Sequence, residues 1–137
     1  MENYFSLSME KRDINAISTL GLAHCGDAVY ELLVRSWLCS TGKAVAANLH
    51  RLTVSYVCAP AQAETVERML PLLSEEELSY YKRGRNAHVR LIPKNATHEQ
   101  YAKATGLECL LGALYLSGQT ARINELFVLT REDAHVL

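Results

Sequence analysis

The pattern of apolar and polar positions is helical along most of the chain. Apolar residues recur at intervals of three and four, and no alternating pattern rich in β-branched residues extends beyond a few positions. The pattern predicts an all-α fold. The expected helices run from between Asp13 and Thr19 to about Cys39, from about Val45 to Tyr56, from about Pro60 to Leu70, from Ser74 to a frayed end at Gly84, from Thr97 to about Leu116, and from Thr120 to about Thr130.

Local signals support these boundaries. Ser74 with Glu77, and Thr97 with Gln100, have the spacing of a capping box, in which two side chains satisfy the free amides at a helix start. The segment 85–96 is the longest piece expected to be non-helical. With 137 residues, 49% of them apolar, the chain is predicted to form one domain over residues 1–137, with its core from about 20 to 130.

Two acidic residues stand in apolar helical surroundings. Asp27 follows Gly26 within the apolar stretch 20–38, and Glu108 lies in "ATGLECLLGALYL", two residues after Gly106. A glycine inside a helix costs about 1 kcal/mol relative to alanine, which suggests a close approach to the backbone at that point. We expect Gly26 to leave a gap through which an ion and a substrate reach Asp27.

Two interpretations of these acids stay open on spacing alone. Mg²⁺ keeps several waters and takes one or two protein carboxylates, which Asp27 and Glu108 could supply. Alternatively, each acid is a buried partner of Arg35, of Lys103 or of a backbone amide, since a buried carboxylate needs a charge or hydrogen bonds.

The composition indicates the cellular compartment and argues against a zinc site. No run of 18 apolar residues lacks a charge, and the N-terminus has neither the basic nor the apolar region of a signal peptide, so we expect a soluble, cytoplasmic protein without a membrane partner. The cysteines form no CxxC pair and lie in apolar sequence, so they are expected to be reduced core residues: Cys25, Cys39, Cys58 and Cys109. The histidines show no zinc-ligand spacing.

Charge is segregated, although the formal net charge is only −1. The stretch "KRGRNAHVRLIPK", residues 82–94, holds five of the 14 lysines and arginines and no acid. A polyanionic partner would therefore be met by a local patch. The alternative is a solvated loop whose charge is balanced by the acidic helix before it.

Six short motifs together resemble one family. "GDAVYELLVR" at 26–35 resembles the signature helix of ribonuclease III, and "LECLLGALYL" at 107–116 resembles a later helix of that family. With "LH" at 49–50, "AQA" at 61–63, "KRGRNA" at 82–87 and "PKN" at 93–95, the series is similar to the smaller branch called mini-ribonuclease III. The resemblance covers roughly residues 20–127.

This resemblance implies the all-helical ribonuclease III catalytic domain, a homodimer that cuts double-stranded RNA with Mg²⁺, for which Mn²⁺ is a substitute. Asp27 matches the signature aspartate and Glu108 the later glutamate, so both are implied to be catalytic and to bind the metal. Full-length members carry a further glutamate where this chain has Ala23 and an aspartate where it has Thr105, and the mini branch shares both losses. The number of metal ions per site stays open. The role of Glu31 also stays open: it is either an outer-sphere carboxylate of the metal site or a residue of the surface or the dimer contact.

RNA binding is expected to fall to the catalytic domain itself, because no double-stranded-RNA-binding domain is expected after the last helix. A-form RNA is recognised mainly by shape and by phosphate position, which suits a basic loop. The candidate RNA contacts are Lys82, Arg83, Arg85, Asn86, Arg90, Lys94, Asn95 and His50. By analogy alone, the task is maturation of a large-subunit ribosomal RNA precursor, with a ribosomal protein as a candidate helper.

Other readings are weaker. A helical RNA-binding module that does not cleave, like the inactive ribonuclease III-like domains of some ribosomes, has no use for both acids. An HD-type metal phosphohydrolase needs an adjacent His-Asp pair, whereas "HCGD" separates His24 from Asp27. His24 could be a general base, but a metal-activated water makes one unnecessary, so we expect a packed residue.

Overall fold

The computed structural model describes residues 1–42, 46–87 and 94–131 of the chain, and every regular element in these ranges is a helix. The all-α prediction is therefore confirmed. The elements are α1 (Lys11–Asn15), α2 (Thr19–Ser40), the 3-10 turn η1 (Ala46–Asn48), α3 (Leu49–Val57), α4 (Ala59–Met69), the 3-10 turn η2 (Leu70–Leu72), α5 (Glu75–Arg85), α6 (His98–Leu116) and α7 (Thr120–Thr130).

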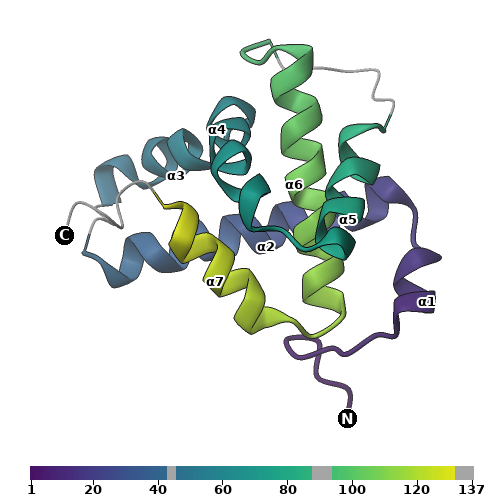
Figure 1. Ribbon diagram of the computed structural model, residues 1–137. Helices are drawn as coiled ribbons and strands as arrows, with labels where there is room; N and C mark the ends of the chain where they lie inside the picture. Colours follow the sequence, from purple (N-terminus) through teal and green to yellow (C-terminus); the bar gives the residue numbers. More distant parts are fainter. Residues whose placement is uncertain (43–45, 88–93, 132–137) are drawn as a thin grey trace.

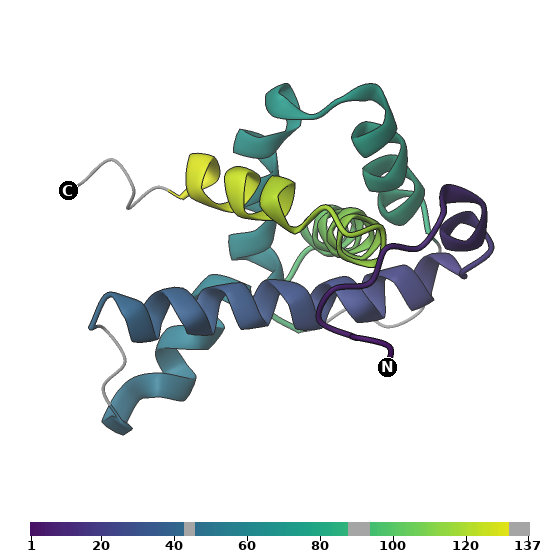
Figure 2. The same ribbon diagram turned by 90° about the horizontal axis from the view of Figure 1, so that it is seen from below.

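Helix α6 is the centre of the molecule. Figure 2 shows it end-on, with α2, α4, α5 and α7 arranged around it. In Figure 1, α2 crosses behind α6, α5 lies along one side, and α3 and α4 lie on the other. The second half of α6 is almost wholly apolar, and Leu107, Cys109, Leu110, Leu111 and Leu114 are all buried. A helix that is apolar all round has to be enclosed, so the others pack against it.

The helix boundaries largely follow the local signals. Both predicted capping boxes form: the Ser74 and Thr97 side chains each accept a hydrogen bond from the backbone three residues on, and Glu77 and Gln100 each reach back. The second predicted helix begins later than expected, at Leu49. No helix within the described residues is both long and apolar enough to cross a membrane.

The predicted fraying at Gly84 is wrong. Helix α5 continues to Arg85, and Gly84 is buried against α6. A Cβ atom at Gly84 would lie 2.6 Å from the carbonyl oxygen of Thr105 and 2.8 Å from the Cα of Gly106. This glycine therefore allows close packing of α5 on α6 rather than ending the helix.

The cysteines are free, as expected, but they are not all core residues. Cys109 is buried, Cys25 and Cys58 are half-buried, and Cys39 is exposed. The expectation for Cys39 is therefore wrong, because it lies near the end of α2, where the helix projects beyond the core.

A buried ion pair joins α5 to α7. The Glu77 carboxylate, 7% exposed as a residue, accepts hydrogen bonds from the Ser74 amide at 2.8 Å and from Arg122 Nε at 2.8 Å. Arg122 also donates to the carbonyl of Leu72 at 2.7 Å. The hydrogen bond from Arg122 is the main reason that the pKa of Glu77 lies below its usual value.

Glu77→Gln is expected to lower the free energy of unfolding at pH 7 by about 2 kcal/mol, because it leaves Arg122 without its buried partner. Since the folded pKa of Glu77 is lowered, its stabilisation is present above the usual carboxyl pKa of about 4.3 and is lost as the pH falls through the folded value. Urea unfolding measured between pH 7 and pH 3 should show that the free energy of unfolding falls less on acidification in the variant than in the wild type. The control is Glu76→Gln, whose exposed carboxylate pairs with Lys11 at 3.6 Å, with an expected change of less than about 0.5 kcal/mol. Equal effects of the two changes would contradict this account.

Candidate active site

The two predicted acids come from helices whose backbones touch. A Cβ atom built on Gly26 of α2 would lie 1.6 Å from the carbonyl oxygen of Glu108, and one built on Gly112 of α6 would lie 2.1 Å from the carbonyl oxygen of Leu22. No side chain fits at either position, so α2 and α6 cross at van der Waals contact. Asp27 directly follows Gly26, and its carboxyl group forms a hydrogen bond with that of Glu108.

The expected close approach at Gly26 is present, but the expected gap is not. The space beside Gly26 is filled by the α6 backbone, with the Gly112 amide nitrogen 2.8 Å from the added Cβ. Access to the acids comes from outside instead, because Asp27 is exposed and Glu108 is half-buried. The glycine brings the two helices together, and Asp27 itself opens to solvent.

The electrostatics of the pair are unfavourable without a cation. Burial, and after it the negative charge of Asp27 and the hydrogen bond between the two carboxyl groups, raise the pKa of Glu108 to about 8, although the hydrogen bond from Gln62 acts in the opposite direction. Two carboxyl groups in such proximity do not both ionise readily at neutral pH. A bound cation would remove that penalty.

Gln62 is a site residue that the sequence did not single out. Its buried side chain projects from α4, and Nε2 donates to the Val57 carbonyl at 2.8 Å and to Glu108 Oε2 at 3.5 Å. These two contacts fix the amide and orient the Glu108 carboxyl group. The only signal in the sequence was its place in the "AQA" motif of the resemblance.

The neighbouring charged residues are engaged elsewhere. Arg35 pairs with Glu31 at 3.1 Å, and Lys103 pairs with Glu67 at 2.6 Å and with Glu99 at 3.1 Å. Arg35 and Lys103 are therefore occupied by acids other than Asp27 and Glu108.

His24 departs from its prediction. The sequence favoured a packed residue, but His24 is exposed, because none of the described helices covers the face of α2 that carries it.

The pair fits a hydrated divalent cation of the Mg²⁺ type. Such an ion uses one or two carboxylates and retains several waters, which requires an open site. In the described part of the chain, no group of three or more His, Cys, Asp or Glu residues is placed to hold a metal ion. Asp27 and Glu108 would hold it, with Gln62 fixing the second carboxylate.

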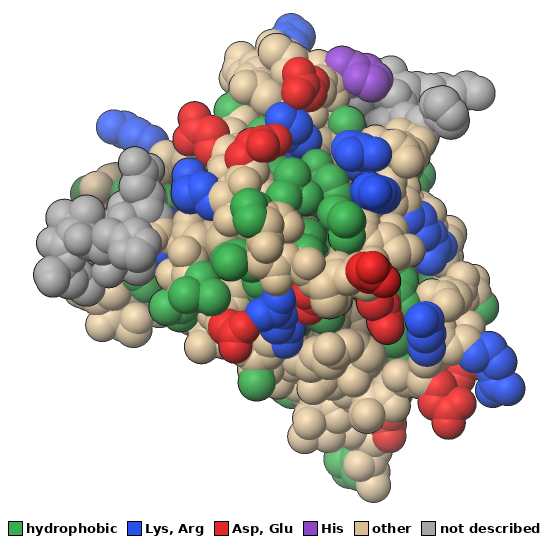
Figure 3. Space-filling model, viewed as in Figure 1, with side chains coloured by type: hydrophobic (Ala, Val, Ile, Leu, Met, Phe, Trp, Pro, Cys, Tyr) green, Lys and Arg blue, Asp and Glu red, His purple; other side chains and the backbone are tan. Residues whose placement is uncertain are grey.

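The basic residues of the predicted RNA contact divide into two kinds. Lys82, Arg85 and Asn86 are exposed at the end of α5, and Figure 3 shows Lys and Arg side chains gathered on that side of the molecule. Lys94 and Asn95 are also exposed, as is His50 on α3. The predicted contact at Arg90 lies outside the described residues.

Arg83 differs from the others because it is tied into the fold. It is half-buried, its Nε donates to Thr19 Oγ1 at 2.8 Å, and its NH2 donates to the carbonyl of Ile17. The structure gives Arg83 the role of joining α5 to the first turn of α2, which the sequence did not predict.

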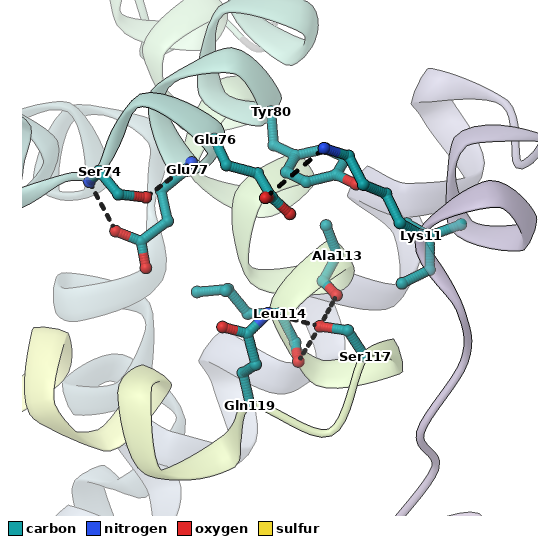
Figure 4. Close-up of a pocket in the computed structure, with 10 residues that line it drawn as sticks. Lys11, Ser74, Glu76, Glu77, Tyr80, Ala113, Leu114, Ser117 and Gln119 are labelled. Carbon is teal, nitrogen blue, oxygen red and sulfur yellow. Dashed lines mark hydrogen bonds and ion pairs between the residues drawn. The ribbon is translucent and has the colours of Figure 1, made fainter.

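A separate cavity of about 280 Å³ lies between α1, α5 and the end of α6 (Figure 4). Its polar groups mostly bond one another: Lys11 pairs with Glu76, Ser74 with Glu77, and Ser117 Oγ with the carbonyls of Ala113 and Leu114. Neither Asp27 nor Glu108 lines it, so this cavity is distinct from the candidate active site.

Comparisons with known proteins agree on one family. The ribonuclease III domain matches residues 20–119. The chain is similar to a mini-ribonuclease 3 from Enterococcus faecalis, with 44% identity over 84% of this chain and 89% of the relative, and to one from Clostridium tetani, with 37% identity over 94% and 87%. A crystal structure of a protein from Fusobacterium nucleatum superposes with a TM-score of 0.75 at 31% identity, covering 83% of this chain and 91% of that one.

Proposed function

Because the chain belongs to the ribonuclease III family and is an endoribonuclease of its mini-ribonuclease 3 branch, we propose that it cleaves double-stranded RNA at the Asp27–Glu108 pair with Mg²⁺, or with Mn²⁺ as a substitute. The observation that carries the proposal is the convergence of these two carboxyl groups at the contact between α2 and α6. They are the residues that match the family's metal-binding acids. The catalytic unit is proposed to be one domain with its core over residues 20–130.

The reaction is hydrolysis of a phosphodiester bond. Water attacks the phosphorus, the bond from phosphorus to the 3′ oxygen breaks, and the products carry a 5′-phosphate and a 3′-hydroxyl. A divalent ion at the site would supply a nucleophilic water at neutral pH and would offset charge on the phosphate. Asp27, at the solvent side, and Glu108, deeper and fixed by Gln62, provide the negative charge that holds such an ion.

Substrate binding is proposed to involve the exposed basic end of α5. Replacing Lys82 and Arg85 together by alanine should weaken binding of double-stranded RNA and reduce the slope of log K against log salt by about two. The slope is measured in EDTA by fluorescence anisotropy at several salt concentrations. Lys11→Ala, an exposed lysine paired with Glu76, is the control and should leave the slope unchanged. An unaltered slope in the double variant would mean that the end of α5 is a solvated surface that does not contact RNA.

A homodimer is proposed as the working form. Large apolar side chains are exposed on two helices, Leu20 and Leu32 on α2 and Val128 and Leu129 on α7. Leu32 lies in the apolar stretch 20–38, yet it is 56% exposed, which a second copy of the chain would explain. Leu32→Asp should give a monomer in sedimentation equilibrium while retaining helical circular dichroism. Ser79→Asp, at an exposed position of α5, is the control and should remain dimeric, and a dimeric Leu32→Asp variant would place the interface elsewhere.

The proposed biological setting is the cytoplasm, where the substrate is a precursor of large-subunit ribosomal RNA and a ribosomal protein is a candidate helper. The relatives carry the name mini-ribonuclease 3, and this support is family analogy.

Incubation with long double-stranded RNA tests the proposed activity. The wild type should cut the RNA in Mg²⁺ and leave it intact in EDTA, and Asp27→Asn should bind the RNA on a gel without cutting it. RNA that the wild type retards but never cuts, with Mg²⁺ or Mn²⁺ present, would favour the non-catalytic binding module instead.

A further inference from the structure

Among the described residues, one buried arginine has no anionic partner. Arg131, just after α7, is 8% exposed, and its buried Nε has no hydrogen-bond partner in the part of the chain that the structure describes. No ion pair to its guanidinium is found within residues 1–42, 46–87 and 94–131. A buried charge in this condition is costly unless an anion completes it.

Aromatic rings account for only part of its environment. The guanidinium carbon lies 4.3 Å from the ring centre of Trp37, 4.6 Å from that of Tyr56 and 5.0 Å from that of Phe127. Cation–π attraction offsets some of the cost of burial. It does not supply an oxygen acceptor for Nε, and no described residue supplies one.

A small pocket opens beside this arginine and contains a second one. Its volume is about 150 Å³, and its lining residues come from α3, from α4 and from the position just after α7. Arg68 lines it and is held in place, since its Nε donates to the Thr130 carbonyl at 2.9 Å. The hydroxyl-bearing Ser55 and Thr65 line it as well, and Glu64 is the one acid among the lining residues.

We propose that this pocket, which we call the Arg68–Arg131 pocket, binds a single phosphate group. Two fixed guanidinium groups match the oxygens of phosphate, and hydroxyl groups add further donors. The volume suits one tetrahedral oxyanion but is below the range of roughly 300 to 1,000 Å³ of pockets that enclose larger ligands. The site is separate from Asp27 and Glu108 and does not depend on the proposed cleavage.

Titration of inorganic phosphate into the full chain, followed by ³¹P NMR at ionic strength held constant with NaCl, tests the pocket. The wild type should bind saturably, and Arg68→Gln should bind at least about tenfold more weakly, because a charge-assisted hydrogen bond is lost. Glu64→Gln should bind more tightly, since it removes a repelling charge. Arg12→Gln, which alters an exposed arginine paired with Asp13, and Glu108→Gln should bind like the wild type. Arg131→Lys keeps the charge but loses Nε, and it should also weaken binding; circular dichroism of each variant confirms folding.

Two results would overturn the proposal. One is the lack of saturable binding by the wild type, or equal binding by Arg68→Gln. The other concerns Glu132 and Asp133, the two acids that follow Arg131 in the sequence. If phosphate binds only after Glu132→Gln and Asp133→Asn are introduced together, the natural anionic partner of the pocket is one of these carboxylates and not phosphate.

A second binding experiment, with short RNA duplexes in EDTA, identifies the source of the phosphate. If the pocket takes an RNA end, Arg68→Gln removes the preference of the wild type for a 5′-phosphorylated duplex. If it takes a backbone phosphate, the variant binds both duplexes more weakly. If RNA binding is unchanged while inorganic phosphate binding is weakened, the ligand is free phosphate.

Discussion

Cleavage of double-stranded RNA is expected to fall by about a thousandfold or more when Glu108 is replaced by glutamine. The amide keeps the size of the side chain but loses the charge that would hold a divalent ion. Such an ion contributes several kcal/mol to phosphodiester hydrolysis, and about 4 kcal/mol corresponds to roughly a thousandfold in rate. The measurement is single-turnover cleavage at saturating Mg²⁺ and excess enzyme.

The same substitution should stabilise the metal-free protein. In the metal-free protein, folding has to protonate Glu108 or bury its charge beside Asp27; Glu108→Gln removes this cost, so the melting temperature in EDTA at neutral pH should rise while activity disappears. Unfolding cannot account for that combination. Glu31→Gln, which alters an acid paired with Arg35, is the control and should retain activity within about threefold. A Glu108→Gln variant that cuts RNA at the wild-type rate would remove Glu108 from the site.

Gly26→Ala is expected to destabilise the fold by at least about 3 kcal/mol, the upper part of the range for overpacking. The added Cβ would lie 1.6 Å from the Glu108 carbonyl oxygen. Because that atom belongs to a helix backbone, it cannot rotate away as a side chain does, so α2 and α6 would have to separate. Urea unfolding monitored by circular dichroism measures the loss.

Gly21→Ala is the matched control on the same helix. Its Cβ would approach Ser18 Oγ at 2.9 Å and Ile17 Cγ2 at 3.0 Å, both ends of side chains that can shift. Alanine also favours the helix by about 1 kcal/mol, so the net change should stay within about 1 kcal/mol. Equal stability of the Gly26→Ala variant and the wild type would contradict the backbone contact between α2 and α6.

The sequence predicted the helices well because their signals are local. Capping boxes at Ser74 and Thr97 and the helical spacing of apolar residues act within a few positions, so they can be recognised without knowing the fold. The fate of Gly84 could not be recognised in this way. A glycine weakens a helix by itself, and only the contact with α6 shows why this one is kept inside α5.

The candidate site was predicted in part for the same reason. Asp27 and Glu108 stood out as acids in apolar surroundings, and the structure places their carboxyl groups together. Gln62 was missed because a glutamine between two alanines carries no charge to mark it, and its role appears only through a contact 46 residues distant. His24 was assigned to the interior because a helical pattern gives the face of a residue but not the partner that covers it.

The attachment of Arg83 to Thr19 and Ile17 has a geometric consequence. Arg83 lies between Lys82 and Arg85 in the sequence, at the end of α5. Its hydrogen bonds hold this end of α5 against the start of α2, the helix that carries Asp27. Thr19 and Asp27 are eight residues apart on one continuous helix, which spans about 12 Å along its axis. The separation between the basic end of α5 and Asp27 is therefore set by one continuous helix rather than by a flexible loop, so the proposed RNA contact and the proposed cleavage site would keep a constant spacing.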